Sequence, residues 1–171
     1  DQVDDLRPGH WLTFSNSQLA DLNNQLPDDA AYKAKGNVYN ALLYQGDLRS
    51  AIADLITGTG NDTLIGNDRD NKLMAGAGTD IIVAGGGDDT ISGGPGADTI
   101  HFGPGSDVAR DNLGNLNGDT MMDFGFHASV DIVGSPIGRD SVAITPTVAT
   151  VSSGGSTFQL NGDFAGGGNA G

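Results

Sequence analysis

The chain has 171 residues, no cysteine and a formal net charge of −14, and all 22 of its acidic residues are Asp. This length allows one domain with its own core. The acidic charge argues against a nucleic-acid-binding protein, which needs basic patches, and no apolar run reaches the length of a membrane-spanning helix. Without disulfides a narrow core needs another means of stabilisation, and bound metal is the usual substitute. Asp is also typical of turns, so the composition predicts carboxylates held in turns.

Residues 1–49 contain no repeat and are predicted to form a cap. We expect a strand broken by a Pro-Gly turn, a short helix capped by a serine, and a second strand, over residues 6–11, 17–23 and 38–44. Repeat arrays need their terminal layers covered. This region is therefore expected to close the N-terminal end of the segment that follows.

A nine-residue repeat begins at Thr57 and dominates residues 50–110. Its six blocks read TGTGNDTLI, GNDRDNKLM, AGAGTDIIV, AGGGDDTIS, GGPGADTIH and FGPGSDVAR, without an insertion. Glycine recurs at the second and fourth positions of every block but the second, Asp or Asn at the sixth, and an aliphatic residue at the eighth. A fixed period of this kind is the signature of a calcium-binding parallel β-roll.

The residue types in these blocks fit calcium. Glycine allows backbone conformations that residues with a Cβ avoid, so each turn can aim its carbonyl oxygens at one point, and the sixth residue adds a side-chain oxygen. Ca²⁺ takes about six to eight oxygen ligands in irregular geometry. The predicted metal ligands are Gly58, Gly60, Asp62, Asn67, Asn71, Gly76, Gly78, Asp80, Gly85, Gly87, Asp89, Gly94, Gly96, Asp98, Gly103, Gly105 and Asp107.

Each block is expected to make half a circuit, so that neighbouring turns on one edge of the roll are two blocks apart. An ion between neighbouring turns then gives about four sites. The triplets around the eighth residues are expected to be very short strands whose middle side chains stack into a thin core. One edge is predicted to carry Asp62, Asp80 and Asp98, the other Asn71, Asp89 and Asp107, and the core Leu64, Leu73, Ile82, Ile91 and Ile100.

The second block departs from the pattern. Asn67 and Arg69 replace its glycines, and Asn71 replaces its aspartate. We expect its calcium site to be the loosest of the set, with Asp68 and Asp70 as candidates to replace the lost carboxylate.

The period ends after Asp107, and residues 111–165 are predicted to form an antiparallel β cap. The alternating apolar residues and the Gly154-Gly155 turn favour a hairpin. We expect a polar loop over residues 111–119, strands over 120–126 and 130–133, a hairpin of 141–150 with 157–160, and a mobile glycine-rich tail over 166–171.

The blocks resemble RTX nonapeptides, the G-G-x-G-x-D-x-U-x repeats of proteins exported by type I secretion. Residues 49–56 (RSAIADLI), which lead straight into the first block, and residues 119–124 (DTMMDF) resemble more narrowly the C-terminal domain of serralysin-type secreted metalloproteases. The chain departs from that pattern at Ser129, where the family has an aspartate, and in its GGGNAG end.

This resemblance implies an all-β, right-handed parallel β-roll with about four or five calcium ions, and it adds Asp119 as a ligand beside Asp107 in the last site. It also implies a bacterial protein that is secreted through type I machinery, with an N-terminal catalytic zinc domain in the parent chain.

Other functions find less support in the residues. The Gly-x-Gly steps lack the third glycine of a dinucleotide-binding loop. The three histidines have no metal-ligand spacing, and a chain without Glu holds no H-E-x-x-H motif. We therefore expect a non-catalytic module. A calcium-stabilised adhesion or polysaccharide-binding module and an enzyme complete in these residues remain as alternatives.

Calcium is expected to decide whether the chain folds. A thin core and converging carboxylates predict an expanded chain in the absence of the ion. Extracellular modules bind Ca²⁺ with dissociation constants of about 10⁻⁴ to 10⁻³ M, far above cytosolic levels. The chain is thus expected to stay unfolded and threadable inside the cell and to fold outside it.

Overall fold

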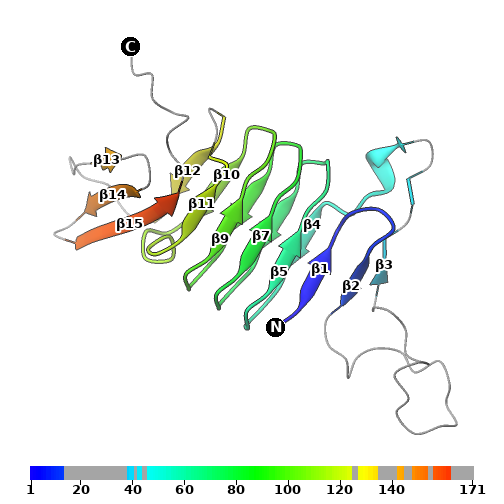
Figure 1. Ribbon diagram of the computed structural model, residues 1–171, viewed down its shortest axis with the longest axis horizontal. Coiled ribbons are helices and arrows are strands. Elements are labelled where there is room, and N and C mark those ends of the chain that lie inside the picture. The colour runs from blue at the N-terminus through cyan, green and yellow to red at the C-terminus, as the bar shows by residue number, and fades with distance from the viewer. Residues whose placement is uncertain are drawn as a thin grey trace, which may run out of the picture.

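The computed structural model describes residues 1–13, 38–40, 42–43, 46–124, 127–134, 142–144, 148–153 and 156–162 (Figure 1). The predicted helix over residues 17–23 and the tail over 166–171 lie outside the described residues. Apart from a 3₁₀ turn, η4 (Leu48–Ser50), every regular element described is a strand. The strands are β1 (Val3–Asp5), β2 (Trp11–Thr13), β3 (Val38–Tyr39), β4 (Asp54–Ile56), β5 (Thr63–Ile65), β6 (Lys72–Met74), β7 (Ile81–Val83), β8 (Thr90–Ser92), β9 (Thr99–His101), β10 (Val108–Asp111), β11 (Thr120–Met122), β12 (Ser129–Ile132), β13 (Val142–Ile144), β14 (Val148–Ser153) and β15 (Ser156–Gly162).

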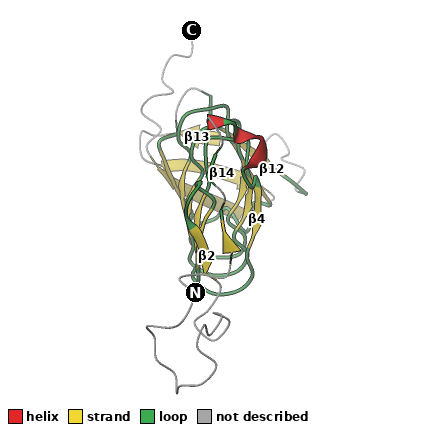
Figure 2. Ribbon diagram, turned by 90° about the vertical axis from the view of Figure 1, so that its right-hand side faces the viewer, coloured by secondary structure: helices red, strands yellow, loops and turns green. Residues whose placement is uncertain are grey.

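The strands of the repeat alternate between two sheets, as a roll of half-circuit blocks requires. One sheet has the order β13-β14-β15-β11-β9-β7-β5-β1-β2-β3 and the other β12-β10-β8-β6-β4. Figure 2 looks along the roll and shows the two layers of strands joined by loops along both edges. The fold is an all-β parallel roll of about four turns, as the period predicts.

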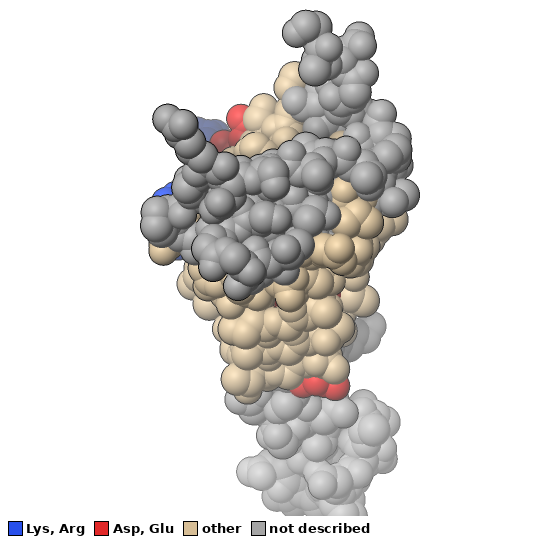
Figure 3. All heavy atoms as spheres, turned by 90° about the vertical axis from the view of Figure 1, so that its left-hand side faces the viewer, with Lys and Arg blue, Asp and Glu red and all other residues tan. Residues whose placement is uncertain are grey.

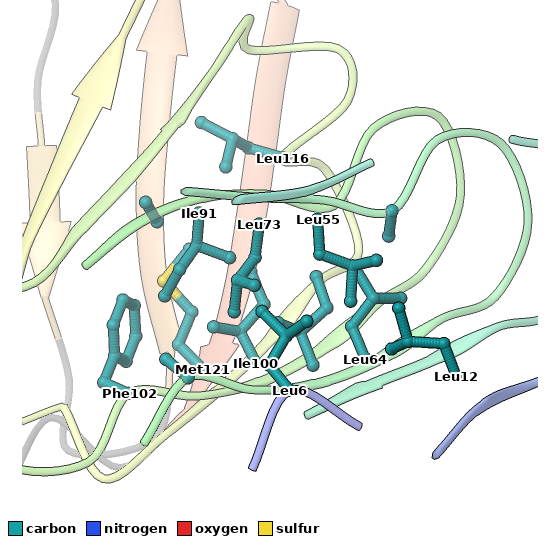
Figure 4. Close-up of a cluster of buried hydrophobic side chains, with 14 residues drawn as sticks. Leu6, Leu12, Leu55, Leu64, Leu73, Ile91, Ile100, Phe102, Leu116 and Met121 are labelled. Carbon is teal, nitrogen blue, oxygen red and sulfur yellow. The ribbon is translucent and has the colours of Figure 1, made fainter. Parts of the chain in front are cut away.

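The register of the roll follows the repeat. Leu64 pairs with Ile82, and Ile82 with Ile100, so each strand aligns with the one 18 residues further on. These middle side chains are fully buried between the sheets, whereas their neighbours face outward. Burying an aliphatic side chain contributes about 1.5–3 kcal/mol. The aliphatic side chains of the two sheets face one another in a narrow band, with Phe102 and Met121 at one end (Figure 4).

The N-terminal region differs from the predicted cap. The Pro-Gly turn expected within residues 6–11 is present at residues 8–9, but residues 6–10 as a whole form the turn between β1 and β2, so within this range only Trp11 belongs to a strand. β1 pairs in parallel with β5 and continues the parallel sheet of the roll, and β2 and β3 then extend this sheet in antiparallel fashion. Asp4 lies opposite Leu64 and is fully buried. Because Asp is a poor strand former, the sequence VDD gives little indication of a strand.

The C-terminal region combines both kinds of pairing. β11 pairs in parallel with β9 and β12 with β10, so both parallel sheets of the roll continue beyond residue 110. The strand expected over residues 120–126 is shorter than predicted, because Asp123 has a left-handed φ of 58°. β14 and β15 pair in antiparallel fashion, as the hairpin pattern predicts. Residues 141–150, expected as one arm of that hairpin, instead include β13 and the start of β14, which pair with each other, and β15 joins the roll in parallel beside β11.

Candidate metal centre

The turns of the roll stack along two edges, each of which carries a column of buried acidic or amide side chains. We call the column Asp62, Asp80, Asp98 and Asp119 the first ladder and the column Asn71, Asp89 and Asp107 the second ladder. Each member except Asp119 ends a six-residue turn of the repeat, and all are nearly inaccessible to solvent. Figure 3 faces the C-terminal end of the roll, where acidic side chains reach the described surface at only a few points.

Hydrogen bonds link the members of the first ladder. The backbone N–H of Asp62 donates to Asp80 Oδ1 at 2.7 Å, that of Asp80 to Asp98 Oδ1 at 2.9 Å, and that of Asp98 to Asp119 Oδ1 at 3.0 Å. One oxygen of each of these acceptor carboxylates is therefore fixed by the preceding turn. The resemblance assigns Asp119 to a site beside Asp107, but the structure places it beside Asp98 at the end of the first ladder, on the edge opposite Asp107.

The second ladder follows the same rule. The Asn71 backbone N–H donates to Asp89 Oδ1 at 2.7 Å, and that of Asp89 to Asp107 Oδ1 at 2.9 Å. The two columns do not mix, so the predicted division of the acidic residues between two edges matches the structure.

The second oxygens of five ladder carboxylates have no hydrogen-bond partner within the described part of the chain. The Oδ2 atoms of Asp62, Asp80, Asp89, Asp98 and Asp107 are buried and accept no hydrogen bond from any residue that the structure describes. A buried charged oxygen without a partner is costly, because it has lost its hydration. A row of such oxygens, held in place through Oδ1, fits a hard cation with oxygen ligands such as Ca²⁺.

The turns also leave no space between successive backbones. The carbonyl oxygen of Gly58 lies 2.0 Å from where a Cβ of Gly76 would stand, and Gly76 has a φ of 100°. Only glycine allows this approach and this conformation together. Backbone oxygens are in this way brought close to the next turn on the same edge.

A cation between neighbouring turns would meet mixed donors rather than a cluster of acidic side chains. Among the described residues, no three Asp or His side chains converge as a metal-binding group. Neighbouring members of a ladder supply at most two carboxylates, so an ion with six to eight oxygen ligands has to draw the remainder from backbone carbonyls and water.

Burial perturbs the titration of the ladders. Desolvation raises the pKa of Asp89 to about 7, of Asp98 to about 6 and of Asp119 to about 7, and it also raises the pKa of Asp80 and Asp107. Neighbouring carboxylates add to the rise, such as Asp107 for Asp89 and Asp98 for Asp119. The protein scaffold by itself thus disfavours the charged form, which a bound cation would favour.

These shifts predict that acid stabilises the calcium-free fold. An unfolded Asp titrates near 3.9, below the raised folded pKa values of Asp89 and Asp119, so the folded state binds more protons and its stability falls as the pH rises through about 6–7. In chelator, where the chain is expected to be unfolded at pH 8, the β-sheet signal in circular dichroism is expected to increase as the pH falls to 5. In saturating calcium the gain is expected to shrink or reverse, because protons compete with the ion. A calcium-free β-sheet signal that falls on acidification would contradict the burial of these carboxylates.

The turn over residues 66–71 departs from the others. Asn67 and Asn71 are buried, but their side chains take part in hydrogen bonds with neighbouring chain segments. Asp68 and Asp70 are exposed, and Asp70 Oδ1 accepts the N–H of Asp88 at 2.9 Å. The structure therefore does not bring these two aspartates to the ladder.

Asp111 is a functional candidate that the sequence pattern missed. It is buried and accepts hydrogen bonds from Ser92 Oγ at 2.6 Å, Gly94 N–H at 3.1 Å and Asn115 Nδ2 at 2.7 Å. Both of its oxygens therefore have hydrogen-bond partners, and the carboxylate links the turn that begins near Gly94 to the loop that contains Asn115. It lies outside the nine-residue register, and no signal in the period points to it.

Comparison with known proteins agrees with the nine-residue repeat. A family model described as the RTX calcium-binding nonapeptide repeat (4 copies) matches residues 56–91 and 74–109. The two matches together cover both edges of the repeat. No curated protein matches the chain. Residues 56–109 are therefore RTX nonapeptide repeats, and the chain carries an RTX calcium-binding β-roll.

Proposed function

We propose that this β-roll folds when it binds extracellular Ca²⁺ and that it supports the type I secretion and the stability of a larger exported protein. The observation that carries the proposal is the row of five buried Oδ2 atoms without hydrogen-bond partners among the described residues. Such a row favours the unfolded chain until a cation neutralises it.

The proposed ligands are narrower than the sequence pattern alone predicts. They are the carboxylates of Asp62, Asp80, Asp98 and Asp119 on the first edge and of Asp89 and Asp107 on the second, together with backbone carbonyls of the glycine turns. The amides of Asn67 and Asn71 are left out because their hydrogen bonds are already made. We expect about four ions.

The calcium contribution is large enough to decide between folded and unfolded chains. At free calcium ten times the dissociation constant each site adds about 1.4 kcal/mol, so that four sites add about 6 kcal/mol. Net stabilities of domains are about 5–15 kcal/mol. Removing the ions is thus comparable to removing the whole stability of a marginal domain.

Secretion and the parent protein follow from this dependence and from the resemblance. At cytosolic calcium the chain would remain unfolded and suited to threading through an exporter, and it would fold outside the cell. The similarity of residues 49–56 and 119–124 to serralysin-type proteases supports a parent with an N-terminal zinc protease domain. The module itself would be non-catalytic and extracellular. No helix among the described residues is both long and apolar enough to cross a membrane.

The adhesion alternative has less support. A polysaccharide-binding face is expected to expose a row of aromatic side chains. The exposed large apolar side chains in the described ranges are instead Val3, Leu42, Ile52, Ile56, Ile81, Val83 and Met122.

Circular dichroism tests the proposed folding step. The chain is expected to give a disordered spectrum in chelator and a β-rich spectrum in millimolar Ca²⁺, with full reversal on chelation. Mg²⁺ is the control, because it demands octahedral geometry and holds its water tightly, and it is expected to induce little structure. A β-rich spectrum that chelator leaves unchanged would rule out calcium-coupled folding.

A further inference from the structure

The second block departs from the repeat at three positions, and the three residues found there make the same kind of contact. Asn67 and Arg69 stand at the glycine positions, and Asn71 stands at the aspartate position. Each donates a side-chain hydrogen bond to the same segment. The bonds are Asn67 Nδ2 to Ile52 O at 2.7 Å, Arg69 Nη1 to Ala51 O at 2.8 Å and Asn71 Nδ2 to Ala53 O at 3.1 Å.

The acceptor segment, residues 51–53, leads into the roll. It precedes β4, which is the end strand of its sheet, and it lies 18 residues before the turn that binds it. The segment therefore stands where a preceding turn of the second edge would be, but it has neither glycines nor a ladder aspartate. Its carbonyl oxygens alone could therefore supply only one side of a calcium site.

The side-chain oxygens of Asn67 and Asn71 accept hydrogen bonds from backbone N–H groups of their own turn. Asn71 Oδ1 accepts the N–H of Asn67 in its own turn at 2.8 Å, whereas ladder aspartates such as Asp89 accept an N–H from the turn before. Asn67 Oδ1 accepts the N–H of Arg69 at 3.0 Å. Neither Asn67 nor Asn71 contributes a buried unpaired atom, in contrast to five of the aspartates in the described ladders.

We propose that Asn67, Arg69 and Asn71 form a metal-independent lock, in which two amides and one guanidinium take the place of the cation at the start of the second edge. The guanidinium supplies a permanent positive charge and directed donors, and the amide donors satisfy carbonyls that an ion would otherwise bind. The inference rests on the proposed function, since it assumes that calcium is bound by the ladder aspartates. Its consequence is that the second edge begins without an ion and binds calcium only from Asp89 onward.

The test compares Asn71→Ala with Asp89→Ala by counting bound calcium in equilibrium dialysis and measuring Tm in saturating calcium. Asn71→Ala is expected to leave the number of ions unchanged and to lower Tm by roughly 3–10 °C, because buried carbonyls lose their donor. Asp89→Ala is expected to lower the number of ions by at least one. Arg69→Met, which removes the guanidinium and its charge but keeps an unbranched apolar stem, is expected to behave like Asn71→Ala and serves if the latter fails to fold.

The outcomes separate the two hypotheses. Loss of an ion in Asn71→Ala or in Arg69→Met would overturn the lock, as would an unchanged Tm in both. Those results leave the calcium ladders intact as long as Asp89→Ala loses an ion. An unchanged ion count in Asp89→Ala would instead count against the proposed function.

Discussion

Asp80→Asn is expected to weaken calcium binding at two sites together. Asp80 lies in the middle of the first ladder, between Asp62 and Asp98, and its Oδ2 is buried without a hydrogen-bond partner in the described structure. The substitution preserves size and the Oδ1 acceptor but removes the charge. With about 1.4 kcal/mol per site at ten times the dissociation constant, the loss is about 3 kcal/mol, and Tm in calcium is expected to fall by roughly 6–12 °C.

Asp88→Asn is the matched control for this substitution. Asp88 also accepts a backbone N–H 18 residues away, from Ser106 at 2.8 Å, but its side chain is exposed. The substitution Asp88→Asn therefore removes one charge but no proposed calcium ligand. Isothermal titration of both variants is expected to show weaker binding and fewer ions for Asp80→Asn alone. Equal calcium binding by the two variants would show that the ladder carboxylates are not the calcium ligands.

Gly76→Ala is expected to raise the calcium concentration at which the roll folds. The new Cβ would stand 2.0 Å from the Gly58 carbonyl oxygen, and Gly76 has a φ of 100°, which L side chains rarely adopt. Backbone strain of about 1–3 kcal/mol adds to overpacking of about 1–3 kcal/mol. The sum, about 2–6 kcal/mol, is similar to the contribution of the calcium ions themselves, so a higher calcium concentration is expected to be needed for folding.

Gly58→Ala tests whether steric fit, and not merely glycine content, is responsible. Gly58 has the same place in its block as Gly76, but a Cβ there meets no atom within 4 Å, and its φ is not positive. Its calcium titration by circular dichroism is expected to stay close to that of the unchanged chain. If the two variants fold at the same calcium concentration, the stacked turns are not as close as described.

The repeat made most of the roll predictable. The eighth-position aliphatics Leu64, Ile82 and Ile100 and the sixth-position aspartates are fixed by one period, and a half circuit per block places partners 18 residues apart. Strand position, core and the division into two edges follow from this arithmetic, because each block repeats the same local conformation. The narrower ligand set depends on hydrogen bonds that a pattern of residue types does not reveal.

The ends of the roll were less predictable, because their pairing depends on distant partners rather than on local preference. β1 is rich in Asp and forms a strand only because β5 offers an edge with matching register. In the second block, three exceptions to the pattern suggested a loose calcium site. The structure instead places Asn67, Arg69 and Asn71 as donors to residues 51–53, a segment outside the repeat.

A crystal structure of the chain grown with calcium tests the central claim most directly. We expect ions between neighbouring turns on both edges, with the Oδ2 atoms of Asp80, Asp98 and Asp89 at about 2.3–2.6 Å from them. Electron density for calcium only at exposed carboxylates, with those buried Oδ2 atoms paired to protein donors, would contradict the account.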